Sequence, residues 1–208
     1  MKWLFPALAL SVTPVAAQAQ TTPAPAPVLE CSPPFTRETT AEEFAKAFGQ
    51  PNVVTADLDG AEGSKERGTV LFPKDAARRL EIFWNDADKR RRPGAVVIKD
   101  RSRWTLRTAD RKVIGVGSPI ELVEQANGGP FSMSGFGWDM GGYATDWRGG
   151  ALNAYPGGCT VSIRFEPDPK APAAALNKVS GDKTIASSDP AFKAVKARVS
   201  VISIGWAQ

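Results

Sequence analysis

Two stretches of the 208-residue chain carry matching patterns when one is moved along the other by 79 residues. The shift places Thr39 on Ser118, each at the start of an expected helix, and residues 80–84 on residues 159–163. In residues 80–84 and 159–163, apolar side chains occupy the same alternate positions, so the same strand face is apolar in both. A shift of one residue would place them on opposite faces. We therefore expect a duplicated helix-plus-sheet unit, with chance similarity as the alternative because few positions are identical.

The first unit is expected over residues 36–100 and opens with a helix. Thr39 and Glu42 have the spacing of a capping box at a helix start. Phe44 and Phe48 lie one turn apart and therefore share a helix face. Alternating apolar residues between turn-forming residues predict that strands follow over residues 53–58, 68–72 and 80–84.

The second unit is expected over residues 118–166 and repeats this order. Ser118 is the predicted cap, Pro119 suits the first helical position, and Glu121 completes a second capping box. The helix is expected to end near Gly128, where glycine favours termination. Three strands are then expected over residues 131–138, 143–147 and 159–165.

The remaining segments complete an α+β fold of two tandem helix-plus-antiparallel-sheet repeats. Residues 101–117 are expected to form a connecting hairpin, and residues 167–208 a C-terminal extension. Within the extension, Asp189 and Pro190 favour the start of a short helix reaching residue 197. An edge strand is expected over residues 199–206.

The N-terminal residues indicate export. Residues 1–19 combine Lys2, an apolar run and a small-x-small sequence, which predicts a signal peptide cleaved before Gln20 and a periplasmic protein. Residues 20–35 are rich in Pro, Ala and Thr and are expected to form an extended linker. No stretch approaches the roughly 20 apolar residues of a spanning helix, so no membrane span is expected.

The cysteines and histidines limit the chemistry that is available. Export favours a disulfide between Cys31 and Cys159. The chain has no histidine, which removes the usual activation of Ser and Cys nucleophiles and the commonest metal ligand. No glycine-rich phosphate loop has the required spacing. We expect neither a metal site nor a cofactor.

Residues 128–150 concentrate aromatic residues and glycines. The phase of alternation changes between Met133 and Phe136, which predicts a β-bulge, and residues 139–142 suit a tight hairpin turn. Alternation cannot place all of the rings inward, so some are expected to face outward and bind a partner, while the core is the alternative for each. The candidate binding residues are Phe136, Trp138, Asp139, Tyr143, Asp146, Trp147 and Arg148.

Two carboxylates leave an enzymatic alternative open. Asp139 and Asp146 flank the expected hairpin, and Glu62 would lie near them if the two units pack together. Paired carboxylates beside tryptophans can cleave a glycosidic bond when they lie about 5 to 9.5 Å apart across a cleft. The competing interpretation is that both aspartates form turns by bonding to their own backbone.

Two resemblances bear on the fold. The motifs Asn127-Gly128-Gly129-Pro130-Phe131 and Gly135-Phe136-Gly137-Trp138-Asp139 resemble a family of uncharacterised exported bacterial proteins, which implies a Gram-negative periplasmic location. The duplicated unit is also similar in layout to β-lactamase-inhibitor-protein-like folds, which include small outer-membrane lipoproteins of barrel assembly. The inhibitors bind an enzyme across a concave, aromatic-bearing sheet. The chain lacks their disulfide within each repeat and lacks the acylatable cysteine of the lipoproteins.

These observations favour a non-catalytic periplasmic binding module over a histidine-free carbohydrate-processing enzyme. The expected surface is an aromatic, glycine-rich sheet face with an arginine-rich rim, and the partner is an unidentified periplasmic protein or cell-envelope component. A net charge of +4 is too weak to predict nucleic-acid binding. The basic residues 89–92 form either a solvated turn or a surface for an anionic partner.

Overall fold

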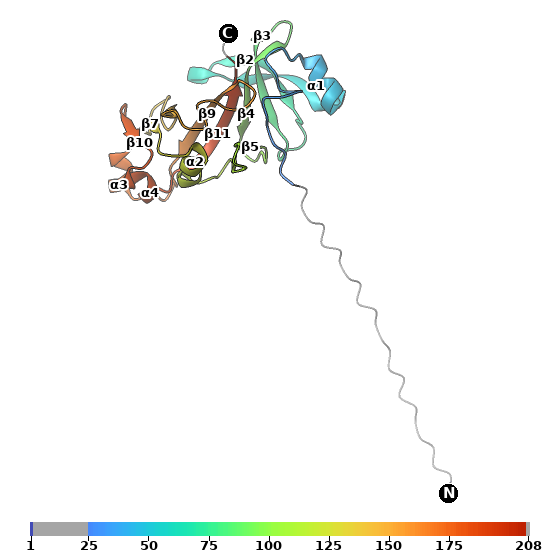
Figure 1. Cartoon of the computed structure of the whole chain (residues 1–208). Coiled ribbons are helices and arrows are strands. Elements are labelled where there is room, and N and C mark those ends of the chain that lie inside the picture. The colour runs from blue at the N-terminus through green and yellow to red at the C-terminus, as the bar shows by residue number, and fades with distance from the viewer. Residues whose placement is uncertain (2–24, 207–208) are drawn as a thin grey trace.

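The chain has an α+β fold in which antiparallel strands predominate (Figure 1). The computed structural model describes Met1 and residues 25–206, so the expected cleavage before Gln20 and nearly all of the signal peptide 1–19 lie outside the described residues. The helices are α1 (Ala41–Phe48), α2 (Ile120–Asn127), α3 (Ala173–Lys178) and α4 (Pro190–Ala194), with 3₁₀ turns at Gln50–Asn52 and Ala61–Gly63. The strands are β1 (Val53–Asp59), β2 (Lys65–Leu71), β3 (Leu80–Asp86), β4 (Arg91–Lys99), β5 (Thr105–Arg107), β6 (Val113–Gly115), β7 (Ser132–Ser134), β8 (Ala144–Asp146), β9 (Thr160–Glu166), β10 (Thr184–Ala186) and β11 (Arg198–Gly205).

Three antiparallel sheets organise these strands. The largest has the order β1-β2-β3-β4-β11-β9, a second has the order β10-β7-β8, and β5 pairs with β6 in the connecting hairpin. A single bridge between Tyr143 and Arg164 links the start of β8 to β9, so the two larger sheets meet there. In Figure 1 the smaller sheet lies with α3 and α4 at the end of the molecule away from α1.

One face of the six-stranded sheet forms the main core. The apolar phase expected for residues 80–84 and 159–165 is confirmed, because the alternate residues of β3 and β9 are buried. Each large apolar side chain buried in this way stabilises the fold by roughly 1.5–3 kcal/mol. The buried apolar residues on β3, β4, β9 and β11 include Leu80, Ile82, Trp84, Val96, Ile98, Val161, Ile163, Phe165, Val199, Ile202 and Ile204.

Both helices form near their expected positions, with different caps. The capping box of α1 joins Thr40 and Glu43, one residue later than expected, since the Thr39 hydroxyl donates to the carbonyl of Pro34 instead. Helix α2 has no side-chain cap. The hydroxyl of Ser118 accepts from the backbone N–H of Gly115, so the predicted capping box at that end is wrong.

The C-terminal residues are integral to both larger sheets rather than an appended extension. Strand β11 lies between β4 and β9, so the expectation of an edge strand over residues 199–206 is wrong. It pairs with β4 from Val201 opposite Lys99 to Gly205 opposite Ala95. Strand β10 pairs with β7. Alternation identifies a strand but not its neighbours, and these partners lie far apart in sequence.

The segment before α1 also departs from the expected linker. The backbone N–H of Leu29 donates to the carbonyl of Thr105 at 2.8 Å, and the side chain of Leu29 is fully buried. Phe35 is buried as well, with its ring 5.4 Å from that of Phe44. Residues 27–35 therefore form part of the packed body, because two large apolar side chains and strand-like hydrogen bonds offset their ordering entropy.

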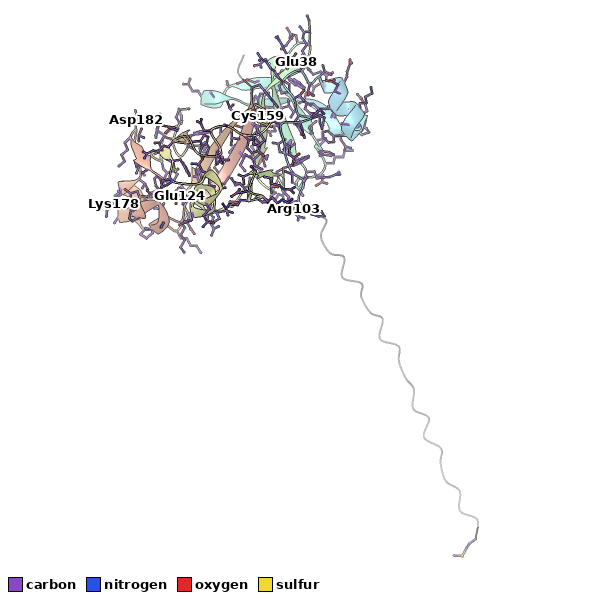
Figure 2. All side chains as sticks on the ribbon, in the orientation of Figure 1. Glu38, Arg103, Glu124, Cys159, Lys178 and Asp182 are labelled. Atoms are coloured by element: carbon purple, nitrogen blue, oxygen red, sulfur yellow. A yellow bond between two sulfur atoms is a disulfide. The ribbon has the colours of Figure 1, made fainter. Side chains whose placement is uncertain are left out.

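A disulfide joins Cys31 to Cys159, which confirms the expected pairing. The Cα atoms lie 6.1 Å apart, within the usual range for such bonds. Cys159 immediately precedes β9 and lies near the middle of the molecule (Figure 2). The bond therefore fixes the segment before α1 to the start of β9, across a sequence separation of 128 residues.

We expect the Cys31→Ser/Cys159→Ser variant to lose about 2–5 kcal/mol of unfolding free energy, because the bond restricts a long loop of the unfolded chain. Urea denaturation followed by tryptophan fluorescence measures this loss. Wild type unfolded under reducing conditions is the control and should give the same midpoint as the variant. If the variant had the same midpoint as disulfide-bonded wild type, the stabilising role of the bond would be contradicted.

Candidate functional site

A groove lies on the second face of the six-stranded sheet. Residues of β3, β4, β11 and β9 that point away from the core form its floor, and the groove has a volume of about 1020 Å³. Most of these side chains are half-buried, so they remain accessible to a ligand. The floor residues are Glu81, Phe83, Val97, Lys99, Ser162, Arg164, Val201 and Ser203.

Two hairpins form the walls of the groove. One wall is the tip of the β1–β2 hairpin, where Ala61–Gly63 make a short 3₁₀ turn. The other is the β7–β8 turn, where the N–H of Gly141 donates to the carbonyl of Trp138 at 2.8 Å. Gly142 has a φ of +79°. A side chain there would collide with the carbonyl of Phe165, so glycine allows this turn to rest against β9.

The β7–β8 wall presents aromatic and apolar side chains to the groove. Trp138 is 36% exposed, and its indole N–H donates to the carbonyl of Gly135 at 2.9 Å. Met140 is 58% exposed. The guanidinium of Arg164 lies 5.4 Å from the centre of the Tyr143 ring and donates from Nε to the carbonyl of Gly141 at 3.0 Å. This cation–π contact and hydrogen bond attach the wall to the floor.

Two of the expected binding residues belong to the core. Trp147 is only 8% exposed, its indole N–H donates to the carbonyl of Val161 at 3.0 Å, and its ring packs 5.0 Å from Phe131. Phe136 is 5% exposed and meets Phe192 edge to face. The expectation that these two rings face a partner is therefore wrong. Trp147 occupies the place where β8 and β9 diverge, and it satisfies a carbonyl of β9 there.

The polar candidates divide between the groove and the surface outside it. Asp139 and Glu62 both line the groove. Asp146 does not line the groove and accepts from the backbone N–H of Arg148 at 2.7 Å. Arg148 donates from Nε to Ser132 at 3.0 Å. Asp146 and Arg148 thus form a local turn beside β7.

Glu81 and Lys99 form an ion pair within the floor. Glu81 is almost fully buried, and its two carboxylate oxygens lie 3.1 Å from a guanidinium nitrogen of Arg79 and 3.0 Å from Nζ of Lys99. A buried carboxylate is costly without counter-ions, so these two cations offset the cost of burying Glu81 and hold its side chain in place. Lys99, held by Glu81, contributes little free positive charge to the groove.

The rim carries an excess of negative charge. Asp59 pairs with Lys65, whose ammonium lowers the pKa of that carboxyl. Glu62, Glu66 and Asp139 make no ion pair or side-chain hydrogen bond with any residue of the described part of the chain. The expected arginine-rich rim is therefore wrong. The basic residues 89–92 lie in the β3–β4 hairpin, outside the groove lining.

Sequence reasoning missed the floor of the groove. Phe83, Val97 and Val201 occupy the outward phase of strands whose inward phase is already apolar. In a sheet with one solvated face these positions are normally polar, so large apolar residues there indicate a second partly covered face. That signal was available in the sequence, although which strands are neighbours was not.

Among Met1 and residues 25–206, no three or more His, Cys, Asp and Glu side chains gather where they could hold a metal ion. Within the same residues, no helix has the length and apolar character needed to cross a bilayer.

Comparison of the chain with protein-family models, with curated proteins and with solved structures gives no match. The resemblances drawn from the sequence motifs and from the repeat thus stay expectations, and the groove itself has to carry any functional argument.

We expect Trp147→Ala to reduce the unfolding free energy by about 3–5 kcal/mol, because it opens a cavity in the core and leaves a carbonyl unpaired. Trp138→Ala should reduce it by about 1 kcal/mol or less, since the ring is partly in solvent. Chemical denaturation of the two variants side by side measures the difference. Equal losses would show that Trp138 is also a core residue.

Proposed function

We propose that the protein is a non-catalytic binding module that holds a protein partner or an envelope component in the groove. The observation that carries this proposal is the exposure of Trp138 and Met140 on the wall of a groove whose floor is partly apolar. Interfaces place aromatic and methionine side chains at the centre of the contact and polar groups around it. The groove likewise combines carboxylates on its walls with these apolar side chains.

We further propose that the module works in the periplasm of a Gram-negative bacterium. The signal-peptide pattern of residues 1–19 supports this location. The disulfide between Cys31 and Cys159 is consistent with it, because such bonds persist in oxidising compartments and not in the bacterial cytoplasm. The motifs of residues 127–131 and 135–139 point to the same location through their family resemblance.

We also propose that the fold is a tandem repeat with the layout of β-lactamase-inhibitor-protein-like folds. The bounds of α2 lie 79 residues after those of α1 at both ends, which supports duplication. The strand order supports it too. Outward from the β4–β11 pair, the strands run β4, β3, β2, β1 on one side and β11, β9, β8, β7 on the other. On the second side, the single Tyr143–Arg164 bridge makes the step from β9 to β8. The same shift relates residues 59–64 to residues 138–143, so the two groove walls are corresponding hairpin tips.

The glycosidase alternative receives less support. Its two carboxylates would have to face one cleft, with one acting as acid and the other as base or nucleophile. Asp139 lines the groove, whereas Asp146 does not and instead bonds to the backbone of its own turn. Asp146 is thus a turn-forming aspartate that does not face Asp139 across the groove, and we therefore propose binding in place of catalysis.

A photo-reactive amino acid placed at position 140 tests the binding proposal in living cells. We expect Met140→benzoylphenylalanine to give a discrete cross-linked product on irradiation, because that side chain extends into the groove wall. The same residue at position 113 is a matched control, since Val113 is 42% exposed and lies outside the groove. Products that are absent at position 140, or identical at both positions, would contradict the proposal.

A further inference from the structure

The two walls of the groove differ in chemistry although they occupy corresponding places. The β1–β2 wall supplies Asp59, Glu62 and Glu66 and no large apolar side chain. The β7–β8 wall supplies one carboxylate, together with the aromatic and thioether side chains of Trp138, Met140 and Tyr143. The groove is therefore polarised, with an acidic wall and an aromatic wall on either side of the same floor.

The charge of the groove opposes that of the chain. Five carboxylates and two cations line it, whereas the whole chain has a formal net charge of +4. Asp59 and Glu81 pair with neighbouring bases, which leaves Glu62, Glu66 and Asp139 against the single cation of Arg164. Glu66 folds over Gly60 at the hairpin tip, which brings its carboxylate to the acidic wall. Such local excess attracts cations and repels anionic ligands.

We infer that the groove binds a polypeptide segment that has a lysine or arginine on one side and an aromatic or large aliphatic residue on the other. This inference rests on the proposed function and specifies its partner. The cationic side chain lies at the β1–β2 wall beside Glu62 and Glu66, and the apolar side chain packs on Trp138 and Met140. The binding direction of the segment is fixed by these two unlike walls.

A polypeptide fits this groove better than a small molecule does. The volume of about 1020 Å³ is at the upper limit of small-molecule sites, which are clefts or cavities of about 300–1,000 Å³ that bury most of the ligand surface. Here the floor is a sheet surface with two separate walls. An extended segment spans such a surface and presents unlike side chains to each wall.

Peptide display on the purified protein tests the inference. A library of random 12-residue peptides is selected on wild type, on Glu62→Gln/Glu66→Gln and on Trp138→Ala/Met140→Ala. We expect wild type to enrich peptides that combine Lys or Arg with an aromatic or large aliphatic residue. The first variant should lose the basic enrichment alone, and the second the apolar enrichment alone.

A matched variant separates the local effect from overall charge. Glu42→Gln/Asp182→Asn also removes two negative charges, but at exposed positions outside the groove. Asp182 is labelled in Figure 2. This variant should enrich the same peptides as wild type. Circular dichroism of each variant verifies folding before selection.

The strongest wild-type peptide is then synthesised with its basic residue replaced by norleucine. This change should weaken binding to wild type about tenfold, as close charge pairs do, and should leave binding to Glu62→Gln/Glu66→Gln nearly unchanged. Equal weakening against both proteins would overturn the inference.

The possible failures are distinguishable. One outcome is that wild type enriches peptides that Trp138→Ala/Met140→Ala does not bind but that carry no basic residue. In that case the inference of a cationic side chain at the β1–β2 wall is wrong, whereas the proposal that the groove binds a partner stands. If wild type enriches nothing above the bare surface, both the partner class and the binding proposal for protein segments fail.

Discussion

The pairing of β4 with β11 holds the architecture together. Residues 95–99 of the chain meet residues 201–205 there, and the buried side chains Ile98 and Ile202 lie directly opposite each other on the core face. This contact joins strands β1 to β4 with the β11–β9 pair in one sheet. It brings together residues about 100 positions apart in the chain. The entropy lost in closing this long loop is offset only when the apolar side chains of the core face are buried.

The groove is a consequence of that pairing. The outward residues of β3, β4, β11 and β9 become one floor, and the hairpin tips at either end become facing walls. The disulfide fixes the start of β9 to the segment before α1, which limits how far the two halves can separate. The floor residues are therefore held in place by the hydrogen-bonded strands of one sheet, which favours binding by preorganisation.

Local patterns predicted the elements of this fold well and their arrangement less well. Alternation located the core face of β3 and β9. It also predicted a strand at β11, but not the place of that strand between β4 and β9. Burial of Trp147 could not be foreseen, because the space it fills exists only where β8 and β9 diverge. Trp138, nine residues earlier, has the same residue type in a similar glycine-rich setting and faces the groove. Only the tertiary structure separates these two cases.

The central claim is that ligands bind in the groove between the two hairpin tips. The tryptophan indole N–H resonances in a ¹⁵N-correlated NMR spectrum report on it, because Trp138 belongs to the groove wall and Trp147 to the core. Addition of the display-selected peptide should shift the Trp138 indole signal in a saturable manner and leave that of Trp147 in place. A Trp138 signal that stays unchanged while the peptide is bound would contradict the account.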